Sequence, residues 1–244
     1  MVLKFTKARI FTLISVALLT GITIASVNTS AAKVNAESVK ETPALQAHLL
    51  FRLGVEASTG ILKIRARYKA ELKDISFETD ELPDYKNPNC ISATCKVFNE
   101  QGGEVKYRKP IAEFLDQRYK NELNFGKWIF VGNVCVEGIG TGKSDCFKDG
   151  INNEEIVAFL PWVQKSICEA LEKPSGRKIP IISANTTHKE LSKFQGSFSD
   201  GLLLASYENG KNILDGISGG CFEGSEGSIF PANSYHYFLV LGAQ

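Results

Sequence analysis

The stretch from Pro43 to Leu72 reads PALQAHLLFRLGVEASTGILKIRARYKAEL and predicts a long helix, around which the expected fold is arranged. Thr42 and Pro43 form a good helix start, because Thr can cap free N–H groups and Pro suits the first helical turn. Apolar residues then recur at intervals of three or four, which predicts one face of a long amphipathic helix. They are Leu45, Leu49, Leu53, Ala57, Ile61, Ile64, Tyr68 and Leu72. Gly54 and Gly60 weaken this pattern, by about 1 kcal/mol each relative to Ala.

The residues before this helix are typical of a membrane-targeting segment. Lys4, Lys7 and Arg9 precede a stretch from Ile10 to Ala32 that carries no charge. As a helix this stretch would be about 34 Å long, enough to cross a bilayer core. Positive charge before it orients the rest of the chain outward. We therefore expect a hydrophobic transmembrane or targeting helix in residues 1–36, an amphipathic stalk helix in residues 37–73 and an extracytoplasmic head in residues 74–244.

The targeting segment has two possible fates. Small residues at Ser30–Ala32 and Val34–Ala36 suit removal by a signal peptidase. The apolar run is longer than that of a usual signal peptide, and its Thr, Ser and Gly residues are typical of helices that pack together in membranes. The sequence slightly favours retention of the helix, as an anchor or as the core of a filament.

The cysteines agree with export. All six lie after the targeting segment: Cys90, Cys95, Cys135, Cys146, Cys168 and Cys221. Six cysteines allow fifteen complete pairings, so the connectivity stays open. Local spacing favours Cys90–Cys95 and Cys135–Cys146, which would leave Cys168 and Cys221 to pair at long range. A zinc site is disfavoured, since no Cys-x-x-Cys pair occurs and no histidine has ligand spacing to a cysteine.

The second half of the chain predicts a mixed α/β head. We expect short helices at Pro110–Asn121 and Pro161–Lys173, and strands at Trp128–Val136, Ile156–Leu160, Gly201–Tyr207 and Tyr235–Leu241. Loops rather than regular crossover helices separate these strands, which favours an antiparallel or mixed sheet. The expected fold class is α+β, with a long N-terminal hydrophobic helix followed by a disulfide-bearing mixed α/β head with an antiparallel sheet.

No motif in the chain predicts catalysis. The segment Gly138–Ser144, GIGTGKS, resembles a phosphate-binding loop, but Glu137 occupies the position of the required first glycine, so a glycine-rich turn is the better interpretation. His236 alternates with two tyrosines in the last strand, and we expect it to face solvent. No serine or cysteine nucleophile signature is present. A net charge of +1 gives no sign of a nucleic-acid partner. We expect no enzymatic activity, no cofactor and no metal.

Several segments together resemble a group of pilin-like envelope proteins of Gram-negative, chiefly alphaproteobacterial-type, bacteria. The resembling segments are Ser92–Pro110, Phe125–Gly142, Leu160–Lys173, Phe194–Gly201, Gly219–Gly224 and Tyr235–Gln244. Those proteins have one N-terminal hydrophobic helix and an exported, disulfide-bearing head. The segment Arg9–Ser15 is more distantly similar to the processing motif of type IV pilins, with Ile10 in place of the glycine and Ser15 in place of the glutamate.

This resemblance implies a structural, pilin-like subunit of an extracellular or envelope filament. Its partner would be the chain itself, with the inner membrane holding the subunit before assembly. The assembly helix would use Phe11, Leu13, Ile14, Ser15, Leu18 and Leu19. The expected location is a membrane-anchored chain with an extracytoplasmic head, or an extracellular filament. The alternative is a binding domain, periplasmic or secreted, from which a signal peptide has been cleaved.

Overall fold

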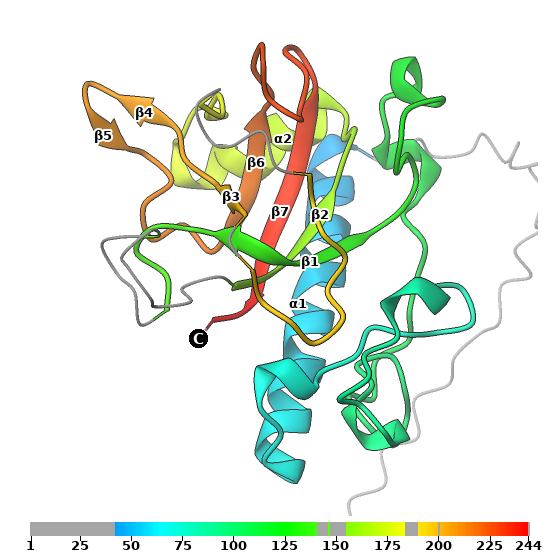
Figure 1. The fold of residues 1–244 in the computed structure, drawn as a ribbon. Coiled ribbons are helices and arrows are strands. Elements are labelled where there is room, and N and C mark those ends of the chain that lie inside the picture. The colour runs from blue at the N-terminus through cyan, green and yellow to red at the C-terminus, as the bar shows by residue number, and fades with distance from the viewer. Residues whose placement is uncertain (1–41, 141–145, 147–154, 184–189, 200, 244) are drawn as a thin grey trace, which may run out of the picture. The chain divides into compact units, whose positions relative to one another are not determined.

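The computed structural model describes residues 42–140, 146, 155–183, 190–199 and 201–243, which belong to one compact unit (Figure 1). These residues form two α-helices, α1 (Pro43–Tyr68) and α2 (Lys165–Glu172). The strands are β1 (Ile129–Cys135), β2 (Glu155–Leu160), β3 (Leu202–Leu203), β4 (Tyr207–Glu208), β5 (Lys211–Asn212), β6 (Gly219–Glu223) and β7 (Tyr235–Gly242). Single 3-10 turns lie at Leu72–Asp74, Pro83–Tyr85, Ala93–Cys95, Ala112–Phe114, Gln117–Tyr119 and Lys173–Ser175.

Five strands form one mixed sheet in the order β3-β1-β2-β7-β6. The β1–β2, β2–β7 and β6–β7 pairs are antiparallel, whereas β3 pairs with β1 in parallel through Val134 and Leu202. A parallel pair is possible here because the long connection through β2 and α2 returns the chain to the edge of β1. The two-stranded hairpin of β4 and β5 stands apart from this sheet (Figure 1).

The expected fold class is wrong. The sheet is mixed rather than antiparallel, because the edge strand β3 runs parallel to β1. In the described part of the chain, neither α1 nor α2 is long and apolar enough to cross a membrane. The helix expected from about Ile10 to Ala32 lies outside the described residues.

Both faces of the sheet are buried, which explains the continuous apolar runs in its strands. Along β7, Tyr237 and Leu239 face a core that α1 and α2 share, whereas Phe238 faces a second core on the opposite side. Along β2, Ala158 and Phe159 are divided between the two cores in the same way. This alternation with a period of two is the geometry of an extended strand.

Helix α1 begins where the sequence predicts, and Thr42 accepts a hydrogen bond from the Leu45 N–H. It packs against β7 and α2, so it belongs to the same unit as the sheet (Figure 1). Gly54 and Gly60 lie on its buried face. A Cβ atom at Gly54 would stand 2.6 Å from Leu239 Cδ2, and one at Gly60 would stand 2.8 Å from Val105 Cγ2. These glycines therefore allow the helix to approach its neighbours closely.

The buried face of α1 is rotated from the face that the sequence predicts. Its buried residues are Gln46, Ala47, Leu50, Gly54, Ala57, Gly60, Ile61 and Ile64. Leu45 and Tyr68, which the predicted stripe includes, are exposed. The apolar spacing alone does not define the buried face, because the glycines that permit close contact carry no hydrophobic signal.

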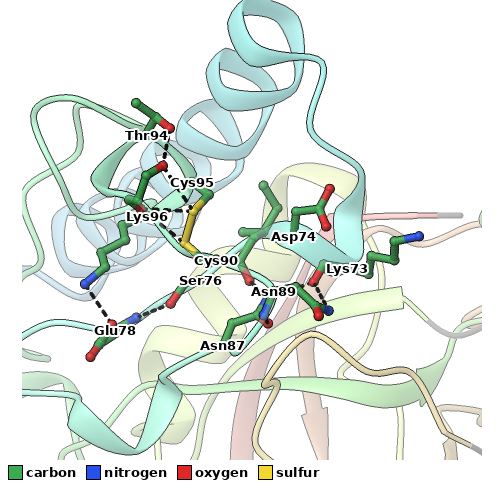
Figure 2. Close-up of a disulfide and its surroundings, with 12 residues drawn as sticks. Lys73, Asp74, Ser76, Glu78, Asn87, Asn89, Cys90, Thr94, Cys95 and Lys96 are labelled. Carbon is green, nitrogen blue, oxygen red and sulfur yellow. Dashed lines mark hydrogen bonds and ion pairs between the residues drawn. A yellow bond between two sulfur atoms is a disulfide. The ribbon is translucent and has the colours of Figure 1, made fainter.

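The chain after α1 forms a lobe that contains single 3-10 turns but no α-helix or strand, and this lobe carries the first disulfide (Figure 2). The Asn87 side chain is buried there, and its Nδ2 donates to the carbonyl oxygens of Lys73 and Ile75, each at 2.7 Å. Backbone hydrogen bonds join Ser76 to both Cys95 and Val97. Local polar contacts and the Cys90–Cys95 disulfide thus hold a segment that has almost no helix or strand.

Candidate functional site

All six cysteines are paired, as Cys90–Cys95, Cys135–Cys146 and Cys168–Cys221. The expectation of disulfide bonds is confirmed, and the pairs are those that local spacing favours. The Cys168–Cys221 bridge is fully buried and joins α2 to β6. Three disulfides indicate an oxidising, extracytoplasmic environment.

The predicted assembly residues cannot be placed. Phe11, Leu13, Ile14, Ser15, Leu18 and Leu19 all lie outside the described residues.

The glycine-rich segment after β1 forms a turn at its described end. Gly138 and Gly140 have φ values of 78° and 71°, which suit glycine. A Cβ atom at Gly138 would stand 2.0 Å from Asp215 Oδ1. An aspartate against this turn would repel a phosphate group. Lys143 and Ser144 lie outside the described residues.

A buried Ser–His pair is the arrangement most similar to a catalytic group in the described residues. Ser234 Oγ lies 2.6 Å from His236 Nε2, and both side chains are completely buried. The expectation that His236 faces solvent is therefore wrong: its ring packs against Trp162, Phe222 and Phe230. Burial lowers the pKa of His236 to about 3.

This pair is poorly suited to catalysis. His236 Nδ1 has no hydrogen-bond partner among the described residues, so no third group orients the ring. A substrate would also need a path to Ser234, which is fully buried. The pair instead satisfies two polar groups inside an aromatic core.

The exposed face of α1 carries a continuous uncharged strip. Its six members are Ala44, His48, Phe51, Val55, Leu62 and Ala66, all of them exposed. At about 100° per residue they fall within an arc of roughly 60° that contains no Asp, Glu, Lys or Arg. Phe51, Val55 and Leu62 are 48%, 39% and 59% exposed. We call this set the outer strip of α1.

The spacing of the outer strip is that of a helix-pairing seam. Its first five members, Ala44 to Leu62, follow one another at intervals of four, three, four and seven residues, which match the a and d positions of a heptad repeat. A helix that packs against a sheet in a monomer needs one apolar face for that packing, and α1 already has such a face. A second apolar arc on the same helix is typical of a surface that contacts another chain.

A cavity of about 270 Å³ lies beside the Cys168–Cys221 disulfide. The end of α2, the segment after it, β6 and the segment after β5 contribute to its walls. It contains the buried carboxylate of Glu172 and the guanidinium of Arg177.

Neither this cavity nor the outer strip of α1 is among the features that we expected from the sequence. In the part of the chain that the structure describes, no group of three or more His, Cys, Asp or Glu residues is placed to hold a metal ion.

No protein-family model, no curated protein and no solved structure matches the chain. The resemblance to pilin-like envelope proteins therefore stays an expectation from the sequence.

Proposed function

We propose that the chain is a non-enzymatic structural subunit of an extracytoplasmic assembly, in which copies associate through the outer strip of α1. The exposed apolar residues Phe51, Val55 and Leu62 carry this proposal. The three disulfides support an extracytoplasmic location, because disulfides persist in oxidising environments. The buried Ser234–His236 pair gives no support for a hydrolase.

A second copy fits the strip best when the two helices run antiparallel. With Val55 at the centre of a two-fold axis, Ala44 would lie level with the partner's Ala66, and His48 with the partner's Leu62. Phe51, the largest member, would lie level with the partner's Thr59, which is small and exposed. The largest side chain of the strip would thus meet a small one, which interdigitated helix packing favours.

The charges beside the strip suit the same arrangement. Arg52 and Glu56 form an ion pair with 2.9 Å between Nε and Oε1, on one flank of the outer strip. In an antiparallel two-fold pair, identical flanks face each other. Arg52 would then lie within roughly 3 Å, measured along the helix axis, of the partner's Glu56. The flank with Arg52 and Glu56 thus carries both signs of charge, which suits pairing with the identical flank of a second copy.

One strip of this size makes a modest contact. Stable interfaces usually bury about 1,200 Å² or more, and three large side chains that are partly exposed offer less than that. We therefore expect weak pairing of free subunits, which becomes stable when many contacts repeat in an assembly.

The test is sedimentation of the purified, oxidised chain over a wide concentration range. The wild type should show reversible association. Leu62→Glu should weaken it at least tenfold, because the substitution removes an apolar side chain from the seam and a charged group would have to lose water there. Leu123→Glu is the matched control, since Leu123 is 82% exposed but is not part of α1.

A photo-crosslinking residue at position 55 tests the register. In the antiparallel pair it should capture peptides from residues 51–59 of the second copy. A chain that stays monomeric at millimolar concentration, or one whose association responds equally to Leu62→Glu and Leu123→Glu, would overturn the proposal.

The cavity beside Cys221 favours a second candidate function, that of a periplasmic or secreted binding domain. Equilibrium dialysis of the purified chain against small organic acids tests this candidate. Retention of none of them would count against it.

A further inference from the structure

The cavity next to the Cys168–Cys221 disulfide is lined by both apolar and charged side chains. The apolar ones include Ile213, Leu214, Ile217 and Phe238. The charged ones are Glu172, Arg177, Lys178 and Glu208. Its volume of about 270 Å³ lies just below the range of roughly 300–1,000 Å³ that is usual for drug-sized ligands, so a small molecule would fit.

The Glu172 carboxylate is buried and has two partners in the protein, one through a hydrogen bond and one through an ion pair. Its Oε1 accepts a hydrogen bond of 3.0 Å from the Cys221 N–H, and its Oε2 lies 2.9 Å from Arg177 Nη2. The side chain is 3% exposed. Gly220 makes this approach possible, because a Cβ atom there would stand 2.5 Å from Glu172 Oε1. Glu172 therefore serves to hold Arg177 rather than to bind a ligand.

Arg177 keeps donors that its protein partners do not use. Its Nε donates to Ser175 Oγ at 3.1 Å, and Nη2 contacts Glu172. The remaining guanidinium N–H groups have no acceptor among the described residues, and the side chain is 36% exposed. Lys178 follows directly at the rim and forms no ion pair within the described chain. Because Glu172 neutralises one of the two positive charges of Arg177 and Lys178, these three groups leave a net charge of +1 at the mouth.

Glu208 is the remaining charge at the rim, and it would oppose an anion. It lies on the exposed β4–β5 hairpin, directly across from Lys211 in the register of the two strands. This cross-strand neighbour offsets its charge. Arg177 and Lys178 therefore determine which ligand charge is preferred.

We propose that this cavity binds a small organic carboxylate with an apolar body. The carboxylate contacts the free edge of the Arg177 guanidinium, a group whose planar donors match carboxylate oxygens. Lys178 adds a second positive charge. The apolar body lies against Ile217, Leu214 and Phe238. A free carboxylic acid and the C-terminus of a peptide both present this chemistry.

Calorimetric titration of the full, oxidised chain tests the site with three probes of equal length: hexanoate, hexylamine and hexanol. Hexanoate should bind, and its affinity should exceed that of the other two at least tenfold. Equal or better binding of hexylamine would overturn the assignment of charge. Binding of none of the three at 10 mM would overturn the site itself.

Two dipeptides identify the source of the carboxylate. Ala-Leu with a free C-terminus and Ala-Leu amide differ only in the terminal charge. Tighter binding of the free dipeptide than of hexanoate assigns a peptide C-terminus, whereas the reverse order assigns a free acid. The amide should bind at least tenfold more weakly than the free dipeptide, and equal binding of the two would contradict a carboxylate site.

Variants separate binding from folding. Arg177→Gln should reduce the affinity for hexanoate at least tenfold, while Arg108→Gln, an exposed arginine elsewhere, should leave it unchanged. Because Arg177→Gln leaves Glu172 buried without its partner, Ile217→Trp provides an independent test. This substitution narrows the cavity and keeps the ion pair, so it should abolish binding with little change in the melting temperature. Full affinity in a folded Ile217→Trp variant would overturn the proposal.

Discussion

The two faces of the five-stranded sheet are buried by different means. Helices α1 and α2 and the lobe after α1 cover one face, where Ile61, Leu50 and Tyr237 are completely buried. The opposite core receives Leu204, Leu214 and Phe230 from irregular segments rather than from helices. Irregular segments can therefore cover one face of a sheet as helices do, although the loop-covered core borders the cavity lined by Leu214, Ile217 and Phe238. Unfolding of variants by denaturant or heat should distinguish the contributions of the helix-covered face from those of the loop-covered face.

The largest effect is expected from the bridge that joins the helical layer to the sheet. Cys168→Ala with Cys221→Ala opens a loop of 53 residues, and the chain-entropy model predicts a loss of about 4 kcal/mol in unfolding free energy. Cys90→Ala with Cys95→Ala opens a loop of only 5 residues and should cost about 2 kcal/mol. Guanidinium denaturation of both double variants measures the difference. Equal losses would show that loop length does not set the contribution of these bridges.

On the helix-covered face, neighbouring residues of α1 should behave in opposite ways. Ile61 is 0% exposed and Leu62 is 59% exposed. Ile61→Ala leaves a cavity against the sheet and should lower the unfolding free energy by about 3 kcal/mol. Leu62→Ala should change it by less than about 0.5 kcal/mol at dilute concentration. Similar losses in urea denaturation would mean that the outer strip is buried within the monomer.

On the loop-covered face, His236 should make stability depend on pH. Its pKa is lowered to about 3 by burial, whereas an unfolded histidine titrates near 6.5. The unfolded chain therefore binds an extra proton between these values, and stability falls as the pH drops from 6.5 toward 3. The slope from this residue is at most about 1.4 kcal/mol per pH unit.

A His236→Phe variant isolates this contribution. Its unfolding free energy should depend less steeply on pH in the same window, while the helix-covered face is unaffected. Chemical denaturation at several pH values provides the measurement. Unchanged slopes in the two proteins would show that another group is responsible.

The smallest effect is expected at the start of α1. Thr42→Ala removes the side-chain acceptor for the Leu45 N–H and should lower the unfolding free energy by at most about 1 kcal/mol. Thr42→Ser keeps an acceptor and is the matched control. Thermal unfolding of the two variants should differ by only a few degrees. A larger loss for Thr42→Ala would mean that the first turn contributes more to the core than its exposure indicates.

The sequence predicts those elements that have a local signal. Thr42–Pro43 identifies the start of α1, and apolar runs identify β1, β2 and β7. It misses β6, because Gly219 and Gly220 are typical of turns, although β7 supplies the pairing that makes this segment a strand. The segment Gly201–Tyr207 was expected to be one strand, but only Leu202–Leu203 pairs with β1. In both segments, pairing with a strand that is distant in the sequence determines which residues form a strand. A short stretch of sequence does not contain that information.

The candidate sites differ in how far the sequence could have found them. The outer strip has a local signal, since Phe51, Val55 and Leu62 recur at heptad spacing beside the more obvious apolar stripe. The cavity has none, because Glu172, Ile213 and Phe238 come from distant parts of the chain. The prediction that His236 faces solvent is wrong because tyrosines such as its neighbours Tyr235 and Tyr237 are also found at protein surfaces. The contacts of Phe222 and Phe230 with the His236 ring are evident only in the structure.

The parallel pairing of β3 with β1 also bears on how the chain reaches its native state. Val134 and Leu202 pair although they lie 68 positions apart in the sequence. Contacts between such distant residues form late, since the chain between them must first be ordered. We therefore expect the edge formed by β3 to be the last part of the sheet to acquire protection in pulsed hydrogen exchange during refolding. Until then β1 would present an open edge, to which other chains could add before folding is complete.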